Sequence, residues 1–578
     1  MELLDKSDYI KRYESVEDKK NSGATYTPKI LADFVAQKIS EKVRDKKLSG
    51  NLFRILDPAI GHGELLVSLL EKLDKENIKN VEVYGFETNQ EALDVAIKRL
   101  IKLFPNVVFK LKMGNFLEYV IENFNTSSRA DLFNKNALEG YDIIIANPPY
   151  VRTQIIKKSE KKILSEKFSL NGHVDLYFAF IIAISQVLKP DGVAGVIVSN
   201  RFMTTSSGKL IRKFLIDGFN LCHIWDFGDT KLFDAAILPA VFIAEGKDDK
   251  KCKKPLFTSI YQTEQQTKIS APNPVEALSY EGVVEVSDGR RFNVQHGTLN
   301  NSGTSDGVWR LSTDEVDLWL NTVFELTWGT FRDIGKIRVG VKTCADKVFI
   351  RNDWHKIPNT ERPELLKPLT THHIAQRFKP LVSEQPKQIL YSHEVVGGKR
   401  RAIDLEYKPL SKAYLEKHRN LLEGREYVIK ANRKWYEIWV PQDPDAWEKP
   451  KLVFRDISEK PIFWLDLEGS VVNGDCYWLV SDSNQEDLLW LAAAVGNSTF
   501  IEKFYDALFN NKLYAGRRRF ITQYVEKFPL PNPDSLVAKE IIEKTKEIYS
   551  CIPSKKAEQL YQELNGLVWE SLTGSRPD

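Results

Sequence analysis

The sequence predicts an α/β fold, a doubly wound mixed sheet, followed by a second domain of α+β type. Between residues 50 and 245, short β-branched runs alternate with helical patterns, as in a parallel sheet covered on both faces. Several of these runs lack polar alternation, which is typical of strands buried on both faces. From about residue 330 the chain is rich in aromatic and basic residues and shows no sustained β-α alternation.

The length also favours two large domains, since one domain usually takes roughly 100–200 residues and this chain has 578. We place the first domain at residues 1–300 and the second at residues 301–578. The charged run GKDDKKCKKP after Glu245 and the polar stretch 262–310 predict a linker region between them.

The individual elements of the first domain follow from local patterns. Thr27 and Pro28 look like a helix N-cap and a first-turn proline, and apolar residues at helical spacing follow them. The runs ELLVSLLEKL (64–73) and NQEALDVAIKRLIKL (89–103) show the same spacing. The clearest strand candidates are LFRILD (52–57), VEVYGF (81–86), YDIIIA (141–146), VAGVIVS (193–199) and PAVFIAE (239–245).

Composition excludes several classes of protein. Charged residues make up 28% and hydrophobic types 42%, which fits an ordinary globular protein rather than a disordered one. The five cysteines show no spacing of a metal site, so we expect no metal and reduced thiols in a cytoplasm. The first twenty residues are too charged for a signal peptide, and no apolar run is long enough for a membrane span.

The strongest chemical signal is the tetrapeptide NPPY at Asn147–Tyr150, directly after the apolar strand YDIIIA. Open α/β sheets place their ligand sites at such strand ends. The Asn147 side-chain oxygen and the Pro148 carbonyl can each accept one hydrogen of an exocyclic amine, whose lone pair is otherwise delocalised into its ring. No strong base is then needed. A base in a duplex must first be flipped out, and Tyr150 offers an aromatic face to stack on it. The alternative interpretation is a structural turn.

A second signal is the glycine-rich turn Asp57–Glu64 (DPAIGHGE), which again follows a strand and precedes a helix. Gly61 and Gly63 would let the backbone approach a ligand closely, although the turn alone could also be a tight strand-helix connection. Glu87 ends the next strand, where a carboxylate can accept both ribose hydroxyls of a nucleoside. We expect a structural role for His62, because the chemistry requires no general base.

These motifs, in this order over roughly residues 20–250, resemble the gamma class of N6-adenine DNA methyltransferases, the group typified by the TaqI enzyme. The resemblance implies S-adenosylmethionine as methyl donor and adenine N6 as acceptor. It implies catalytic roles for Asn147, Pro148 and Tyr150, and stacking of the flipped base on Tyr150 and Phe233. Asn115 stands where many relatives have Asp. The implied donor-binding residues are Thr25, Tyr26, Thr27, Asp57, Ala59, Gly61, Gly63, Glu87, Asn115, Phe116, Asn147 and Pro149.

The C-terminal half resembles target-recognition domains of the same class, in the segments GVKTCADKVFI (340–350), NGDCYWLV (473–480) and GRRRFITQYVEKFPLP (516–531). The expected partner is double-stranded DNA, bound by a monomer, with a restriction endonuclease as a possible companion. The residues expected to contact phosphates are Lys399, Arg400, Arg401, Arg517, Arg518 and Arg519. The sequence does not give the DNA recognition site.

Four alternatives remain at this stage. N4-cytosine methylation uses the same chemistry, but its enzymes more often carry Ser where Asn147 stands. Methyltransferases that modify a glutamine in release factors also use NPPY, but they do not account for some 250 further residues rich in Arg and Trp. A fused nuclease lacks room, because only 24 residues precede Thr25. A pure DNA-binding module is disfavoured by the intact donor motif.

Overall fold

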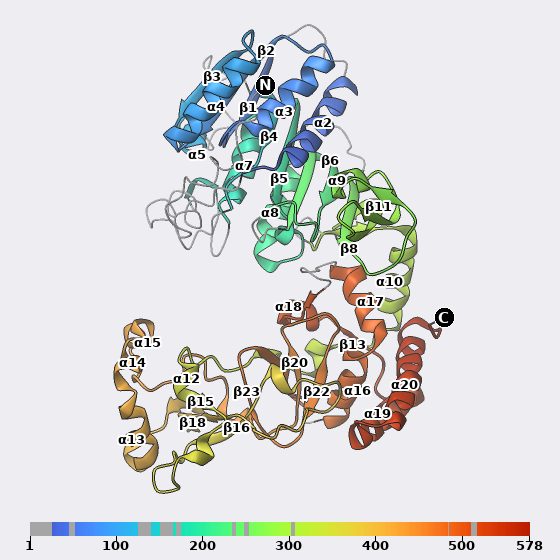
Figure 1. Ribbon diagram of the computed structural model, residues 1–578. Coiled ribbons are helices and arrows are strands. Elements are labelled where there is room, and N and C mark those ends of the chain that lie inside the picture. The colour runs from blue at the N-terminus through green and yellow to red at the C-terminus, as the bar shows by residue number, and fades with distance from the viewer. Residues whose placement is uncertain are drawn as a thin grey trace. The chain divides into compact units, whose positions relative to one another are not determined.

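The computed structural model describes residues 26–45, 52–124, 140–150, 166–168, 175–233, 238–247, 254–301, 307–483, 485–509 and 517–577. These residues form two compact units, one up to Thr313 and one from Asp314. Each unit is described by itself (Figure 1).

The first unit is built on one large mixed sheet. Its strand order is β3-β2-β1-β4-β5-β7-β6-β8-β11-β10-β9, and β12 pairs with β11. Pairing is parallel from β3 to β5, and β7 runs antiparallel to β5 and β6. The strands are β1 (Phe53–Asp57), β2 (Val81–Glu87), β3 (Val108–Met113), β4 (Tyr141–Ala146), β5 (Leu188–Ser199), β6 (Phe219–Asp226), β7 (Pro239–Gly246), β8 (Leu256–Gln262), β9 (Ser270–Ala271), β10 (Gly282–Val286), β11 (Arg291–Asn300) and β12 (Arg310–Ser312).

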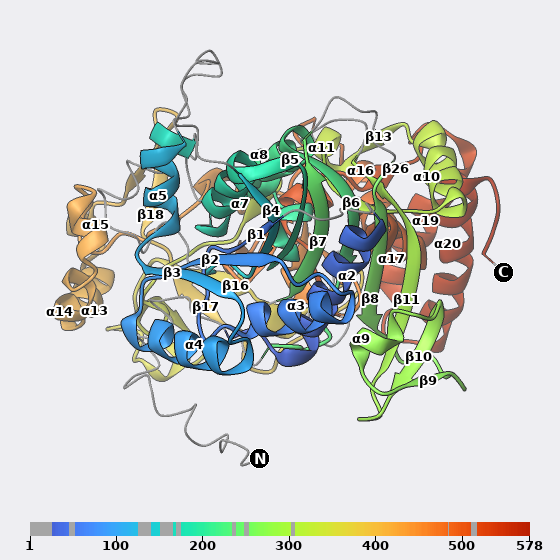
Figure 2. The ribbon, with the colours of Figure 1, turned by 90° about the horizontal axis from the view of Figure 1, so that it is seen from above.

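Helices cover both faces of this sheet, so the predicted doubly wound mixed fold is confirmed (Figure 2). One face carries α2, α3 and α4, and the other carries α5, α7 and α8. Side chains alternate between the two cores along β4, where Ile143 and Ile145 face the first set and Ile144 faces the second. The helices are α2 (Lys29–Asp45), α3 (Glu64–Lys75), α4 (Gln90–Leu103), α5 (Phe116–Asn123), α7 (Tyr177–Val187), α8 (Lys209–Gly218) and α9 (Pro274–Ala277), with 3-10 turns η2 (Asn200–Met203) and η3 (Ser206–Gly208).

The linker predicted at residues 262–310 is wrong. Much of this stretch extends the sheet of the first unit as β10, β11 and β12. Its strands expose one face, so buried Phe292 and Val294 alternate with more exposed neighbours and no long apolar run forms. A period-two pattern was present in the sequence, but the polar residues between the apolar ones concealed it.

The second unit combines short strands with helices, as an α+β fold requires. Its larger sheets have the orders β14-β24-β20-β22 and β15-β17-β16-β23. The strands are β13 (Gly329–Thr330), β14 (Arg338–Val339), β15 (Ile350–Arg351), β16 (Leu366–Thr370), β17 (Gln388–Leu390), β18 (His393–Val396), β19 (Lys399–Ala402), β20 (Lys451–Arg455), β21 (Ile457–Ser458), β22 (Phe463–Asp466), β23 (Val471–Val472), β24 (Cys476–Leu479), β25 (Arg518–Arg519) and β26 (Pro529–Leu530).

Two cores hold this unit together. One lies among α10, α16, α17, α19 and α20, of which α19 and α20 run side by side in Figure 1. The other surrounds the buried Trp354, Trp447, Trp464 and Trp478. The helices are α10 (Asp314–Leu326), α11 (Phe331–Ile334), α12 (Asp346–Phe349), α13 (Pro409–Lys417), α14 (Arg419–Glu423), α15 (Glu426–Lys430), α16 (Glu486–Gly496), α17 (Thr499–Phe509), α18 (Thr522–Val525), α19 (Leu536–Cys551) and α20 (Lys555–Thr573), with 3-10 turns η4 (Trp354–Lys356), η5 (His372–Ile374), η6 (Leu405–Tyr407) and η7 (Pro444–Ala446).

Candidate active site

Three predicted site segments meet at one edge of the first unit's sheet. β1 lies between β2 and β4 and is parallel to both, with Asp57 opposite Gly85 and Leu56 opposite Ile144. The carboxyl ends of the three strands therefore share one edge. The chain changes direction across the sheet here, since β2 and β3 lie on one side of β1 and β4 and β5 on the other. Such a switch point is where open α/β sheets bind ligands.

The glycine turn after β1 is fixed to the end of β2. Glu87 Oε2 accepts a hydrogen bond from the Gly61 amide at 2.9 Å, and Oε1 accepts from the Thr88 and Asn89 amides at 2.8 and 2.9 Å. Gly61 has φ +55°, and a Cβ built on it would meet nothing within 4 Å. Glycine adopts this conformation without strain and leaves the face of the turn open.

Asp57 lies at the floor of the turn and is fully buried. Its Oδ1 accepts a hydrogen bond from the Ala59 amide at 3.0 Å, whereas Oδ2 has no hydrogen-bond partner among the described residues. Burial, and to a smaller extent the charge of Glu87, raise the pKa of Asp57 to about 7, although the hydrogen bond from the Ala59 amide opposes this shift. A buried carboxylate oxygen in this state is suited to a cationic group of a ligand.

The amide of Asn147 is held at both ends. Its Nδ2 donates to Thr27 Oγ1 at 2.9 Å, and its Oδ1 accepts from the Tyr150 hydroxyl at 2.9 Å. Only 9% of Asn147 is exposed. Burial raises the pKa of the Tyr150 hydroxyl well above its usual value, so this group stays protonated and can donate.

The segment before α2 contacts both loops of the site. The Tyr26 ring stacks on His62 of the glycine turn with a centroid distance of 4.1 Å, while the next residue, Thr27, receives the Asn147 hydrogen bond. The structure thus brings Tyr26, Thr27, the glycine turn and Asn147 together. Thr25 lies outside the described residues.

Other residues of the predicted site have structural contacts. Asn115 caps α5, because its Oδ1 accepts from the Leu117 amide at 2.9 Å. Phe116 is 1% exposed, and its ring centroid lies 5.6 Å from that of Phe86. Phe233 is 5% exposed and belongs to the core on the α2 side of the sheet. Contacts of Asn115 and Phe116 with the donor, and of Phe233 with a base, remain predictions.

Sequence reasoning missed Tyr177, which lies beside Tyr150 with a ring-centroid distance of 6.0 Å. Its hydroxyl is buried and has no hydrogen-bond partner among the described residues. Tyr177 begins the apolar helix α7, where the sequence predicts that a tyrosine belongs to the hydrophobic core. No sequence signal therefore distinguished it from its neighbours.

The residues of the basic triplet Arg517, Arg518 and Arg519 differ in whether their guanidinium groups are already paired with a carboxylate. Arg518 forms two hydrogen bonds with Asp506, at 2.8 and 2.7 Å, and Arg519 pairs with Asp456 at 3.1 Å. These pairs occupy groups that the sequence assigned to phosphate contacts, whereas Arg517 is exposed.

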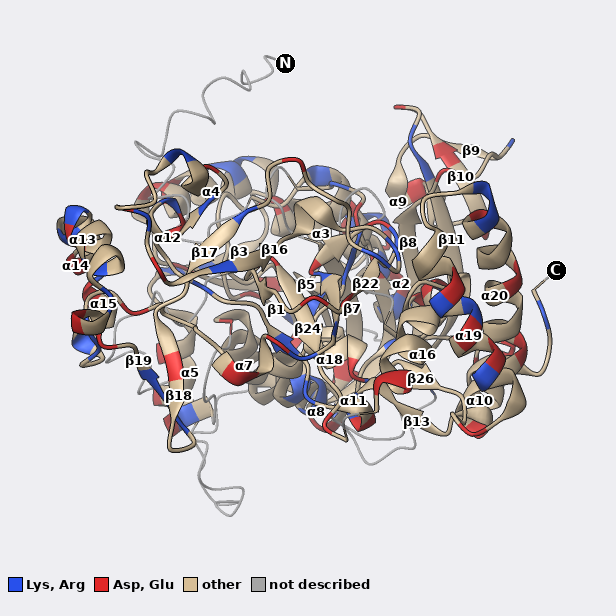
Figure 3. Ribbon diagram, turned by 90° about the horizontal axis from the view of Figure 1, so that it is seen from below, with Lys and Arg blue, Asp and Glu red and all other residues tan. Residues whose placement is uncertain are grey.

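The second triplet lies on β19 of the β18–β19 hairpin (Figure 3). Arg400 donates to the Gln442 carbonyl at 2.8 Å, and Arg401 pairs with Glu394 at 2.9 Å. Lys399 is exposed. The hairpin therefore presents basic groups at the surface while its arginines hold local contacts.

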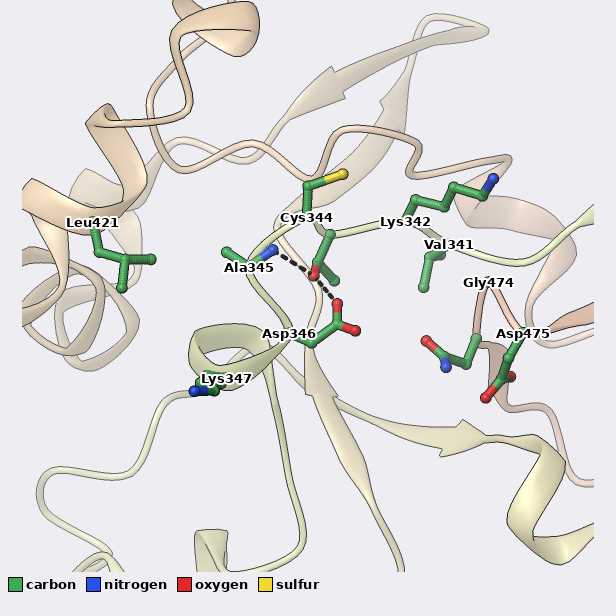
Figure 4. Close-up of a pocket in the computed structure, with 11 residues that line it drawn as sticks. Val341, Lys342, Cys344, Ala345, Asp346, Lys347, Leu421, Gly474 and Asp475 are labelled. Atoms are coloured by element: carbon green, nitrogen blue, oxygen red, sulfur yellow. Dashed lines mark hydrogen bonds between the residues drawn. The ribbon is translucent and has the colours of Figure 1, made fainter. Parts of the chain in front are cut away.

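A pocket of about 650 Å³ opens in the second unit between residues 341–347, Leu421 and residues 473–475 (Figure 4). It joins two segments that the sequence linked to target recognition, bridged by the pairing of Val341 with Asn473. Lys342 and Lys347 are exposed at this pocket, and sequence reasoning did not single them out. Neither lysine belongs to a run of basic residues, so no charge cluster in the sequence marked them.

Among the described residues, no group of three or more His, Cys, Asp or Glu side chains could hold a metal ion. In the same part of the chain, no helix combines the length and apolar character needed to cross a membrane.

Comparisons with known proteins show the family to which this fold belongs. Residues 79–233 match the Eco57I restriction-modification methylase family, and residues 402–530 match the TaqI-like C-terminal specificity domain. The chain is 39% identical to the type II methyltransferase M.BanIII of Aneurinibacillus aneurinilyticus over 93% of this chain and 94% of the relative. It is 25% identical to the type II methyltransferase M.BstVI of Geobacillus stearothermophilus, over 89% and 91%.

Solved structures resemble the chain in fold alone. One is a nuclease-deletion mutant of the type ISP restriction-modification enzyme LlaGI with a DNA substrate mimic, at TM-score 0.53 and 12% identity, covering 91% of this chain and 55% of that chain. Another is the DrdV–DNA complex, at TM-score 0.51 and 12% identity, covering 93% and 59%.

Fold and site together define a methyltransferase. The chain belongs to the type II DNA methyltransferases of restriction-modification systems. The predicted family of restriction-modification DNA methyltransferases is thereby confirmed, and DNA, rather than the alternative of a protein glutamine, is its substrate class.

The Glu87 contacts predict a measurable stability effect. Glu87→Ala removes the acceptor of three backbone amides and should lower the free energy of unfolding by about 1–3 kcal/mol. Glu87→Gln retains one oxygen and should lose less. Urea unfolding checks this, with exposed Glu91→Ala as the control. Equal stability of the Glu87→Ala and Glu91→Ala proteins would contradict the role.

Proposed function

We propose that this enzyme transfers a methyl group from S-adenosylmethionine to N6 of an adenine flipped out of duplex DNA, in the cytoplasm and as a monomer. The modification would protect DNA from a cognate restriction endonuclease. The first unit would hold the donor and the flipped base, and the second would read the sequence. The main support for this proposal is the buried Asn147 amide, which is hydrogen-bonded at both ends. It lies at the sheet edge that also carries Asp57 and Glu87.

The residues of the first unit fit the donor. Asp57 Oδ2 is buried and unpaired among the described residues, which suits the α-ammonium of the methionine moiety. Glu87 keeps lone pairs beyond those used by the backbone amides and can accept ribose hydroxyls. Gly61 leaves the turn open for close approach. When bound, S-adenosylmethionine supplies an electrophilic methyl group on a sulfonium sulfur.

The acceptor amine would be prepared by Asn147 and Pro148. The Asn147 oxygen and the Pro148 carbonyl each accept one N6 hydrogen, which draws the nitrogen toward tetrahedral geometry and makes its lone pair available. Proline at 148 has no amide hydrogen to compete for these acceptors. Tyr150 would stack on the base, and positioning would supply most of the acceleration. Asn rather than Ser at position 147 favours adenine over cytosine.

One experiment tests the assignment of the base. The enzyme is incubated with labelled donor and duplex DNA, and the modified nucleoside is identified after digestion. We expect N6-methyladenine, and N4-methylcytosine would overturn the assignment.

Asn147→Ala tests the mechanism. This variant loses the acceptor oxygen and should retain donor binding while its transfer rate falls by at least about 100-fold, the scale of losing one oxyanion-type contact. Single-turnover assays with saturating donor measure the rate, and calorimetry measures donor affinity. An unchanged rate would remove Asn147 from the site.

Donor binding should depend on pH through Asp57. With its pKa at about 7, the carboxyl is mostly neutral at pH 6 and cannot attract an ammonium. The α-amino group loses its charge above about pH 7.7–8.0. Donor affinity of the free enzyme should therefore peak between these limits and fall about tenfold per unit on the acid side. Calorimetric titration between pH 5.5 and about 8.5 checks this.

Asp57→Asn should bind the donor weakly and lose this acid limb, whereas the exposed Asp74→Asn should keep it. The ionisation of Asp57 should affect folding in the opposite direction: as pH rises, donor affinity increases but the contribution of Asp57 to the free energy of unfolding decreases. A carboxyl whose folded pKa is raised binds more protons when folded, so its contribution is lost as pH rises from about 4 to about 7. An acid limb that persists in Asp57→Asn would contradict the contact.

DNA binding should involve the pocket of the second unit. Lys342 and Lys347 are exposed there and have no ion-pair partner among the described residues. Lys342→Ala and Lys347→Ala should each weaken DNA binding uniformly across sequences and reduce the slope of log K against log salt by about 0.9. Titrations at several salt concentrations check this. Lys546→Ala, a lysine already paired with Asp487 and Glu543, should leave the slope unchanged; equal slopes in all three variants would contradict the assignment.

A further inference from the structure

Both ends of the Asn147 amide contact hydroxyl groups. Nδ2 lies 2.9 Å from Thr27 Oγ1, and Oδ1 lies 2.9 Å from the Tyr150 hydroxyl. A hydroxyl can donate or accept, so these two contacts alone would also satisfy the amide after a 180° flip. The two orientations differ in chemistry, because only one presents an acceptor on the side of Tyr150.

The acceptor amine removes this ambiguity. It offers N–H donors, and a flipped Asn147 would oppose them with its own N–H groups. The productive orientation therefore has Oδ1 toward the amine and Nδ2 toward a group that accepts. The Tyr150 hydroxyl uses one of the two lone pairs of the oxygen that the amine needs, so the second lone pair stays available for the amine. Thr27 contacts the other end and is free to remain.

We propose that Thr27 is a positioning residue that fixes the Asn147 amide with its oxygen toward the acceptor amine, rather than a donor-binding residue as the sequence suggested. The proposal rests on the proposed function, because it concerns the same transfer. Thr27 acts through Asn147 and need not touch either substrate.

The surroundings of Thr27 make it a firm anchor. It directly precedes the first turn of α2, where the Pro28 carbonyl accepts from the Leu31 and Ala32 amides at 3.0 Å. The helix buries Leu31, Ala32 and further residues completely against the sheet. Tyr26 adds a second attachment by stacking on His62. A hydroxyl on such a support can hold a partner side chain within a narrow range of orientations.

The test compares Thr27→Val with Thr27→Ser. Valine keeps the shape and removes the acceptor, so the single-turnover rate at saturating donor and DNA should fall about 5- to 30-fold, the effect of one lost hydrogen bond. Serine keeps the hydroxyl and should restore most of the rate. The donor dissociation constant, measured by calorimetry, should stay unchanged in both variants.

A matched control is Thr267→Val, which removes a half-buried hydroxyl that donates to the Val283 carbonyl at 2.6 Å, in the same unit. It should leave the rate unchanged. A double-mutant cycle with Asn147→Ser adds a readout that general loss of structure would not give, because Thr27→Val should then have little further effect.

Three outcomes would overturn the proposal: a normal rate in Thr27→Val, a weakened donor affinity with a normal saturated rate, or additive effects in the cycle. Its failure is distinct from failure of the proposed function, which would appear as absent N6-adenine methylation by the wild-type enzyme.

Discussion

The parallel pairing of β1 with both β2 and β4 is the constraint on which the site depends. Asp57 closes β1, Glu87 closes β2 and Asn147 follows β4, so no two of these residues are close in sequence. The register aligns the three strand ends at one edge. A shift of one residue in the β1–β4 pair would turn the buried side chains of β4 to the wrong face, and the two cores above and below the sheet oppose this.

Asn147 and Asp57, two buried polar residues at this edge, differ in how completely the protein satisfies their hydrogen bonding. The Asn147 amide has hydrogen-bond partners at both ends, whereas Asp57 Oδ2 has none among the described residues and its pKa is raised to about 7. An unsatisfied buried oxygen costs stability, and sites tolerate that cost where a ligand later supplies the missing group. This contrast supports the proposal that the Asn147 amide is oriented before substrate binds, and that a cationic group of the donor would complete the hydrogen bonding of Asp57.

The sequence predicted the sheet and the main motifs because both depend on local patterns. Buried strands read as apolar runs, and the segments around Asp57 and Asn147 follow such runs directly. The strands at residues 282–300 were mistaken for a linker, since strands with one exposed face have few apolar residues in a row. The contact of Asn147 with Thr27 could not be predicted, because the two residues are 120 positions apart in the chain.

The structure shows which basic residues of the second unit already hold carboxylate partners, and this information is absent from charge clusters in the sequence. Arg518 and Arg519 are adjacent basic residues, yet Asp506 and Asp456 pair with them and fix local structure. Lys342 and Lys347 belong to one short segment without a basic run, and the fold brings this segment to a pocket with the distant residues 473–475. A guanidinium that already binds a carboxylate has fewer free donors and less net charge to offer a phosphate, whereas an exposed ammonium need only release its water and counterions. We therefore propose that the exposed lysines of this pocket contribute more to DNA binding by the second unit than the paired Arg518 and Arg519 do.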